Sequence, residues 1–236
     1  MQTADRRKQM ADGVVLVCFA MKEEAAACKR LLADSSNAEI LITGIGQRNA
    51  ARAIRSALET CRPALVLTCG FAGGLNSRLA SGTVVFDANG NFNLEAAWLK
   101  AGAQAGRFYC AEHVATTAAE KRALFESTRA DAVEMESQGI CAVCVEQKIP
   151  CATVRAILDT ATEDLPLDFN RLMTPEQKLN YGRLAVAILR SPGKIAGLLK
   201  LRKRSKRAAE ALAQVLQKSN CLQKQGPRDS RLHSES

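Results

Sequence analysis

The feature that most constrains the fold is an alternation of short apolar segments with amphipathic helical patterns. Residues 13–20 and 38–43 are mostly apolar and rich in β-branched residues, which is typical of buried strands. Strong helix formers follow each of them, over 21–33 and 49–61, with apolar positions gathered on one face. A third strand pattern follows at 64–70. Alternating strands and helices predict an α/β protein built as a three-layer αβα sandwich.

The pattern is weaker after the third strand. The glycine-rich segment 71–82 is typical of a loop, and residues 87–112 show no persistent period. A capping-box spacing that begins at Thr117 predicts the start of a helix. Residues 151–158 again have the apolar, β-branched pattern of a strand, so Asp159 is expected just beyond a strand end. Open α/β sheets collect their ligands at such ends.

Composition narrows the class of protein. Hydrophobic residues make up 47% of the 236 residues, which is enough for a continuous buried core. Only 4% are aromatic, and no segment interleaves aromatic with basic residues, so we expect no nucleic-acid partner. The first residues lack the pattern of a secretory signal, and no apolar run approaches the roughly 18 residues of a membrane-spanning helix. These features predict a cytoplasmic protein.

The nine cysteines support the same compartment. They are odd in number and scattered through apolar segments, which favours buried free thiols over a disulfide framework. Cys141 and Cys144 form a CxxC pair, but there is no second pair and few histidines to complete a zinc site. We therefore expect no metal site and no redox role for this pair.

The net charge of +9 is concentrated near the C-terminus, where residues 190–207 hold eight basic residues and no acidic one. Apolar positions of the basic amphipathic helix expected there gather near one face, at Ile195, Leu198, Leu199, Leu212 and Val215. The pattern favours either membrane association through 190–207, as a peripheral contact with anionic lipid, or a docked helix with a solvated basic face. The expected organisation is a flexible N-terminus over 1–12, one domain over 13–189, this helix over 190–218 and a disordered tail over 219–236.

Five short motifs occur in one order along the chain. They are Met21-Lys22-Glu23-Glu24, Thr43-Gly44-Ile45-Gly46, Ala72-Gly73-Gly74-Leu75, Val133-Glu134-Met135-Glu136 and Arg155-Ala156-Ile157-Leu158-Asp159. Together they resemble the purine nucleoside phosphorylase and nucleosidase superfamily. Within it, the chain is similar to the methylthioadenosine/S-adenosylhomocysteine nucleosidases and closer still to the hopanoid-associated phosphorylases, over roughly residues 13 to 216.

The resemblance implies a central mixed sheet and an enzyme that cleaves the N-glycosidic bond of a 5′-substituted purine nucleoside, releasing adenine. Adenosylhopane, a lipid-linked nucleoside of hopanoid biosynthesis, is one candidate substrate. A homodimer without a cofactor is implied, with inorganic phosphate as a candidate co-substrate. Two alternatives stay open: a hydrolytic methylthioadenosine/S-adenosylhomocysteine nucleosidase, and a non-catalytic nucleoside-binding module.

The resemblance also implies roles for individual residues. Asp159 would protonate the departing purine at N7, which requires a pKa raised by apolar surroundings. Glu136 would accept hydrogen bonds from the ribose 2′- and 3′-hydroxyls, and its charge would stabilise an oxocarbenium-like sugar. Met135 would pack against the ribose. Glu24 would position or deprotonate the attacking water.

Other matching positions are expected to shape the pocket. Gly73 and Gly74 would let the backbone approach the ligand closely. Phe71 stands where the nucleosidases carry a small hydroxyl residue near the nucleophile, and Leu158 replaces a small polar residue before the catalytic Asp. Residues 87–112 offer no counterpart to the aromatic side chain that stacks on the base.

The identity of the nucleophile stays open at this stage. A phosphate needs cations or backbone amides to hold its charge, and Arg48 beside the Gly44 turn is the only candidate. A water needs only a base, which Glu24 would supply. Arg155 is expected to pair with a carboxylate at the edge of the core, with Glu134 as the candidate, rather than to act in the reaction.

Overall fold

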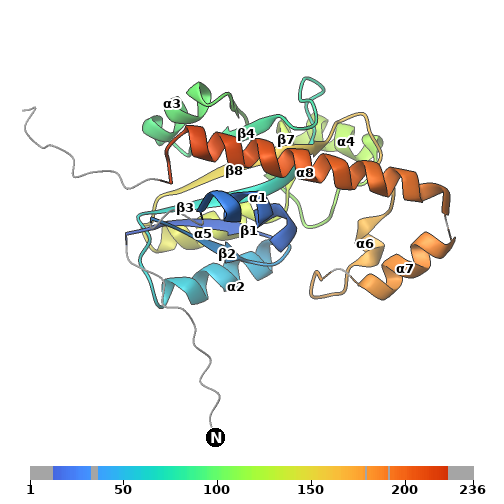
Figure 1. Ribbon diagram of the computed structural model, residues 1–236, viewed down its shortest axis with the longest axis horizontal. Coiled ribbons are helices and arrows are strands. Elements are labelled where there is room, and N and C mark those ends of the chain that lie inside the picture. The colour runs from blue at the N-terminus through green and yellow to red at the C-terminus, as the bar shows by residue number, and fades with distance from the viewer. Residues whose placement is uncertain (1–12, 33–36, 179, 191, 223–236) are drawn as a thin grey trace, which may run out of the picture.

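The computed structural model describes residues 13–32, 37–178, 180–190 and 192–222 (Figure 1). The flexible N-terminus expected over 1–12 and the tail beyond residue 222 lie outside the described residues. Residues 219–222, which the sequence analysis assigns to the tail, follow the last helix and bury Cys221 and Leu222.

The described residues form one eight-stranded sheet. Its strands are β1 (Val15–Phe19), β2 (Ala38–Ile42), β3 (Leu65–Gly74), β4 (Val84–Asp87), β5 (Gln104–Ala105), β6 (Phe108–Cys110), β7 (Ala132–Glu134) and β8 (Cys151–Asp159). Their order is β2-β1-β3-β8-β4-β5, with β7 also paired to β3 and β6 paired to β7. β1, β2, β3 and β8 are parallel neighbours, whereas β4 and β7 pair antiparallel to β8 and β3. The mixed sheet implied by the family resemblance is confirmed.

Helices cover both faces of this sheet. They are α1 (Lys22–Leu32), α2 (Gln47–Leu58), α3 (Phe92–Lys100), α4 (Ala118–Thr128), α5 (Ser137–Glu146), α6 (Phe169–Leu172), α7 (Tyr181–Arg190) and α8 (Ile195–Lys218), which a 3-10 turn at Pro192–Lys194 precedes. None of the helices in the described residues is both long enough and apolar enough to cross a membrane.

Alternation along the strands supplies the two faces. In β1, Val17 and Phe19 pack into a cluster with α1, α3 and α8, whereas Leu16 and Cys18 pack into another cluster with α2 and α5. Figure 1 shows α8 above the sheet and α2 below it. The three-layer αβα sandwich predicted from the sequence is confirmed.

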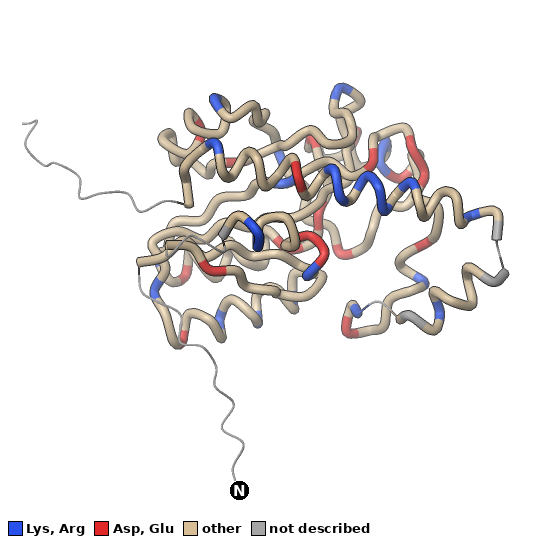
Figure 2. Tube along the Cα trace, in the orientation of Figure 1, with Lys and Arg blue, Asp and Glu red and all other residues tan. Residues whose placement is uncertain are grey.

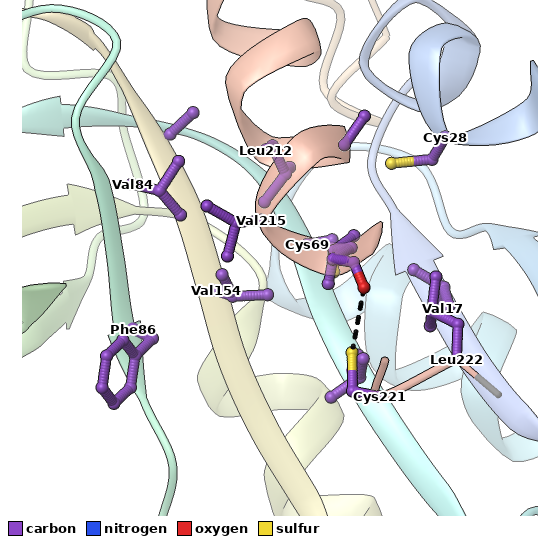
Figure 3. Close-up of a cluster of buried hydrophobic side chains, with 14 of the residues drawn as sticks. Val17, Cys28, Cys69, Val84, Phe86, Val154, Leu212, Val215, Cys221 and Leu222 are labelled. Carbon is purple, nitrogen blue, oxygen red and sulfur yellow. Dashed lines mark hydrogen bonds between the residues drawn. The ribbon is translucent and has the colours of Figure 1, made fainter. Parts of the chain in front are cut away.

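The C-terminal half of α8 belongs to the core. Figure 3 shows its Leu212 and Val215 among Val17, Cys69 and Val154 of the sheet, and all five side chains are buried. The chain that follows is held in place as well, since the Cys221 thiol donates to the carbonyl of Leu216 at 3.7 Å. The helix that the sequence analysis separates at residue 190 is therefore part of the same packed body.

One strand is longer than the sequence predicts. β3 continues to Gly74, into the segment 71–82 that is expected to be a loop. Gly73 pairs with Val133 of β7, and Gly74 pairs with Ala132. A glycine-rich strand end has no periodic pattern of its own, so this pairing depends on a partner that lies far away in sequence.

The region without a period contains a helix. α3 exposes two large apolar side chains, Phe92 and Leu99, and buries Leu94 and Trp98. Apolar residues on both faces obscure the helical period, which explains why no pattern is visible there. The capping box at Thr117 is confirmed, because its side chain and that of Glu120 each accept a hydrogen bond from the other's backbone N–H.

The topology determines where a ligand can bind. β1, β3 and β8 are parallel neighbours, so their carboxyl ends lie at one edge of the sheet. Glu24 lies in the first turn of the helix after β1, Phe71 lies near the end of β3, and Asp159 is the last residue of β8. Three of the expected site residues are thereby brought to the same edge.

Candidate active site

A cavity of about 380 Å³ lies at this edge of the sheet, a size typical of small-molecule sites. Six of the seven residues expected to form the site line it: Glu24, Phe71, Gly73, Met135, Glu136 and Asp159. Gly74 does not line the cavity. A Cβ on Gly74 would lie 3.3 Å from the carbonyl oxygen of Asp159, so this glycine allows close packing of β3 on β8 rather than contact with a ligand.

Glu24 is a buried carboxyl group at the start of α1, with 4% of its surface exposed. Its two oxygens accept hydrogen bonds from the backbone N–H groups of Met21 and Phe71, each at 3.1 Å. Burial raises the pKa of Glu24 to about 7, and the nearby charge of Glu136 adds to the shift. A carboxyl group with this pKa can accept a proton near neutral pH.

Gly70 makes room for this arrangement. Its backbone φ is +144°, and a Cβ there would lie 2.9 Å from Nη1 of Arg155 and 3.0 Å from Oε1 of Glu24. Only a residue without a side chain fits between these two charged groups.

Glu136 lies immediately before α5 and is also buried. One of its oxygens accepts from the backbone N–H of Gly46 at 2.9 Å, and the other accepts from Arg155 at 3.1 Å. Burial raises the pKa of Glu136, while the Arg155 guanidinium opposes that shift. Each carboxylate oxygen keeps a further lone pair for a ligand hydroxyl.

Arg155 compensates the buried carboxylates. Its Nη2 lies 2.5 Å from Glu134 and donates to Thr68 at 2.9 Å, while its Nη1 binds Glu136. Burial alone would raise the pKa of Glu134, but Arg155 and hydrogen bonds from Ser137 lower it. The expected pairing of Arg155 with Glu134 is confirmed, and the same guanidinium also pairs with Glu136.

Asp159 has a charged partner that the sequence analysis does not identify. Its Oδ2 forms an ion pair with Nζ of Lys121, a side chain with no exposed surface. Burial raises the pKa of Asp159, as the sequence analysis expects, while the lysine opposes the shift. Nothing in the sequence distinguishes Lys121 from a solvated lysine of an ordinary helix, because only the tertiary fold buries it.

The remaining lining is mostly apolar, and part of it comes from the C-terminal third of the chain. These residues, absent from the predicted site, are Leu165, Phe169, Met173, Leu201 and Ser205, and His113 also lines the cavity. Two of them, Leu201 and Ser205, belong to α8. The helix expected to lie outside the domain therefore forms part of its cavity wall.

The charged residues that line the cavity among the described residues are all acidic. Five carboxylate residues line it, namely Glu23, Glu24, Glu134, Glu136 and Asp159, and no lysine or arginine of the described residues does. Arg48, the candidate phosphate-binding residue, is exposed and lies outside the lining. Histidine, cysteine and carboxylate side chains do not cluster into a metal site within the described part of the chain.

Known proteins share this fold and part of this sequence pattern. Residues 95–190, which include Glu136 and Asp159, match the model of the phosphorylase superfamily. Helicobacter pylori futalosine hydrolase has the same fold, with 17% identity, 88% of this chain and 97% of that chain covered, and a TM-score of 0.62. The matched segment of the chain is therefore similar to the phosphorylase superfamily.

Two nucleosidases also share the fold of this chain. Helicobacter pylori 5′-methylthioadenosine/S-adenosylhomocysteine nucleosidase, bound to butyl-thio-DADMe-Immucillin-A, is 17% identical over 88% of this chain and 97% of that chain, with a TM-score of 0.62. The Colwellia psychrerythraea enzyme of the same name, in complex with adenine, is 18% identical over 89% of this chain and 96% of that chain, with a TM-score of 0.59. At these identities, the similarity establishes the fold.

Proposed function

We propose that this protein hydrolyses the N-glycosidic bond of a purine nucleoside that carries an apolar 5′ substituent. The observation that carries the proposal is the convergence of Glu24, Glu136 and Asp159 on one cavity whose other wall is apolar. The structurally similar proteins, a futalosine hydrolase and nucleosidases bound to adenine or to a nucleoside analogue, support this reaction class.

The three carboxyl groups have complementary tasks in this proposal. Asp159 gives its proton to N7 of the purine as the bond between N9 and C1′ breaks and its electrons move to the base. Glu136 accepts hydrogen bonds from the ribose hydroxyls, and its charge stabilises the cationic sugar. Glu24 removes a proton from the water whose oxygen forms the new bond to C1′. Atoms and charge balance without a cofactor.

The charge of the lining favours water as the nucleophile. An inorganic phosphate anion would have to enter a cavity with five carboxylate residues and without a lysine or arginine among its described lining residues. A neutral water has no such penalty, and Glu24, with a pKa of about 7, is suited to act as its base. We therefore favour the hydrolytic nucleosidase over the phosphorylase.

The apolar wall supports the choice of substrate class. Four apolar side chains line this part of the cavity: Leu165, Phe169, Met173 and Leu201. Binding a hydrocarbon group against them is favourable because it removes apolar surface from water. A 5′ substituent such as an alkylthio group or a longer hydrocarbon fits this chemistry. Adenosylhopane is the largest candidate and stays a prediction.

Adenine release tests the reaction directly. The protein should release adenine from 5′-alkylthio adenosines at the same rate with and without inorganic phosphate. Asp159→Asn should lower kcat by roughly a hundredfold or more while largely sparing nucleoside binding, because the acid acts in the transition state. Nucleoside binding without release by the intact protein would instead favour the non-catalytic module, and a strict need for phosphate would favour the phosphorylase.

We also propose that the first half of α8, residues 195–206, contacts an anionic membrane. No acidic residue occurs between Glu176 and Glu210, and Figure 2 shows the basic residues of α8 following one another along its first half. Ile195 and Leu199 on this half are 43% and 60% exposed. Cations with exposed aliphatic side chains favour a lipid surface, and the same helix lines the cavity through Leu201.

Vesicle sedimentation tests this contact. The protein should sediment with vesicles that contain phosphatidylglycerol and not with pure phosphatidylcholine. Replacing Lys203 and Lys206 by Glu should abolish binding, whereas Lys100→Glu on α3 should leave it intact. Equal binding of all variants, or binding to RNA alone, would contradict the proposal.

The homodimer implied by the family resemblance is a separate prediction, which sedimentation equilibrium measures.

A further inference from the structure

Lys121 is a buried charge that the proposed reaction has not used. The other charged residues of α4, namely Glu120, Arg122 and Glu126, are exposed, whereas the Lys121 side chain has no exposed surface. Its Nζ forms an ion pair with Asp159 and donates to the carbonyl oxygens of Thr160 at 2.9 Å and Glu163 at 2.7 Å. A fully buried ammonium group needs such compensation, and all of it comes from residues 159–163.

The ion pair gives the two carboxyl oxygens of Asp159 different surroundings. Oδ2 is fully buried and lies against Lys121, while Asp159 as a residue lines the cavity. Oδ1 is therefore the oxygen left for a ligand. The ion pair restrains the orientation of the carboxyl group, and Gly73 of the adjacent strand leaves room beside it, since a Cβ there would lie 3.5 Å from Oδ2.

The segment that holds Lys121 is itself anchored to α8. Glu163 accepts from the backbone N–H and hydroxyl of Thr160, at 3.2 and 2.9 Å. Its carboxylate also accepts two hydrogen bonds from Arg204, at 2.8 and 2.6 Å. This bidentate pair restrains the segment that carries the carbonyl partners of Lys121.

We propose that Lys121 is the positioning residue for proton transfer by Asp159: it holds Oδ2, so that Oδ1 presents the proton to the purine. Lys121 does not line the cavity, so it acts only through Asp159. This inference rests on the proposed function, and it adds a residue that acts through the general acid.

The charge of Lys121 also sets how readily Asp159 gives up its proton. Burial raises the pKa of Asp159 and Lys121 lowers it, while Glu163 raises it and Arg204 lowers it from the other side. Removing only the Lys121 charge therefore raises the pKa of Asp159 further. Because Asp159 acts when protonated, the alkaline limb of the pH profile should move to higher pH. The maximal rate should fall, since the acid becomes weaker and loses its orientation.

Two variants separate this role from simple structural support. Lys121→Met keeps a buried aliphatic chain without the charge, and Lys121→Gln keeps a hydrogen-bond donor without the charge. Both should lower kcat by roughly ten- to a hundredfold, leave KM little changed and move the alkaline limb of kcat to higher pH. The exposed Lys100→Met on α3 is the control and should match the unmodified protein.

The result that overturns the proposal is a folded Met or Gln variant with the wild-type alkaline limb, or one that loses activity only through KM. The Gln variant carries the test if the Met variant does not fold. A second readout needs no activity: titration of the ¹³C carboxyl signal of Asp159, assigned by its loss in Asp159→Asn. If the unmodified protein releases no adenine, the proposed function fails, while an unchanged Asp159 titration in the Lys121 variants overturns this inference separately.

Discussion

Around the cavity, three buried carboxylates depend on a single guanidinium, and a fourth depends on an ammonium. Glu134 and Glu136 contact Arg155 directly, and the same positive charge partly opposes the rise that burial causes in the pKa of Glu24. Asp159 instead pairs with Lys121. The two groups of acids are thus compensated independently, which allows their proton affinities to differ within one site.

The pH dependence of the reaction should reflect Glu24. As a base it acts when ionised, and its pKa is raised to about 7, so kcat/KM should rise as the pH increases through about 7. An ordinary glutamate would place this acid limb near pH 4.5 instead. Glu24→Gln should remove the limb and lower kcat, as initial rates between pH 5 and 9 would measure; the exposed Glu126→Gln should keep it. An acid limb near 7 that survives in Glu24→Gln would contradict the assignment.

Arg155 should matter for stability as well as for the site. Arg155→Met leaves Glu134 and Glu136 buried without their cation, which should lower the free energy of unfolding by about 3 to 5 kcal/mol. Arg55→Met is the matched control, because its ion pair with Glu146 is exposed and should contribute at most about 1 kcal/mol. Urea unfolding at neutral pH compares the two, and similar losses would show that burial of the pair is not what matters.

At the scale of elements, α8 combines two surfaces along one helix. Its first half exposes Ile195 and Leu199 together with the basic residues, and its second half buries Leu212 and Leu216 in the core. Leu201, between them, lines the cavity. A single helix thus connects the solvent-facing surface, the binding site and the hydrophobic core.

Substitutions in the two halves of α8 should differ sharply. Leu212→Ala creates a cavity in the core and should lower the free energy of unfolding by about 2 to 5 kcal/mol. Leu199→Ala removes the same number of atoms from an exposed position and should change it by less than about 0.5 kcal/mol. Chemical denaturation measures both, and equal effects would mean that the C-terminal half does not pack as described.

At the scale of the whole molecule, residues 13–189 and α8 share one hydrophobic core. The cluster on the α8 side of the sheet includes residues of β1, β3 and β8 together with Trp98 of α3 and Leu212 of α8. A body whose layers depend on one another in this way should unfold cooperatively.

Unfolding should therefore occur in a single transition. The buried Trp98 reports on the core beside Phe86, with ring centroids 5.2 Å apart, and far-ultraviolet circular dichroism reports on the helices. The two signals should give coincident urea transitions. An earlier loss of helical signal, before the fluorescence changes, would instead indicate that residues 190–218 unfold as a separate unit.

The local sequence predicts much of this architecture. Short apolar runs rich in β-branched residues identify β1, β2 and the start of β3, and the Thr117 capping box marks the start of α4. These signals are readable because each depends on residues a few positions apart. Six of the residues predicted from the family resemblance also line the cavity, including Glu24, Glu136 and Asp159. Their chemical roles stay predictions for the experiments above.

Long-range packing decides the rest. The extension of β3 requires pairing with β7. The ion pair between Arg155 and Glu136 requires the start of α5 to lie beside β8. The cavity wall requires Leu201 of α8 to meet Leu165 at one site. Lys121 shows the reason most directly: a lysine in a helix is ordinarily solvated, and only the approach of β8 and the segment after it turns this one into the partner of Asp159. The sequence by itself determined the elements with a clear local pattern and the candidate acids; the tertiary structure decided which charges compensate these acids, because burial and pairing arise only when distant segments meet.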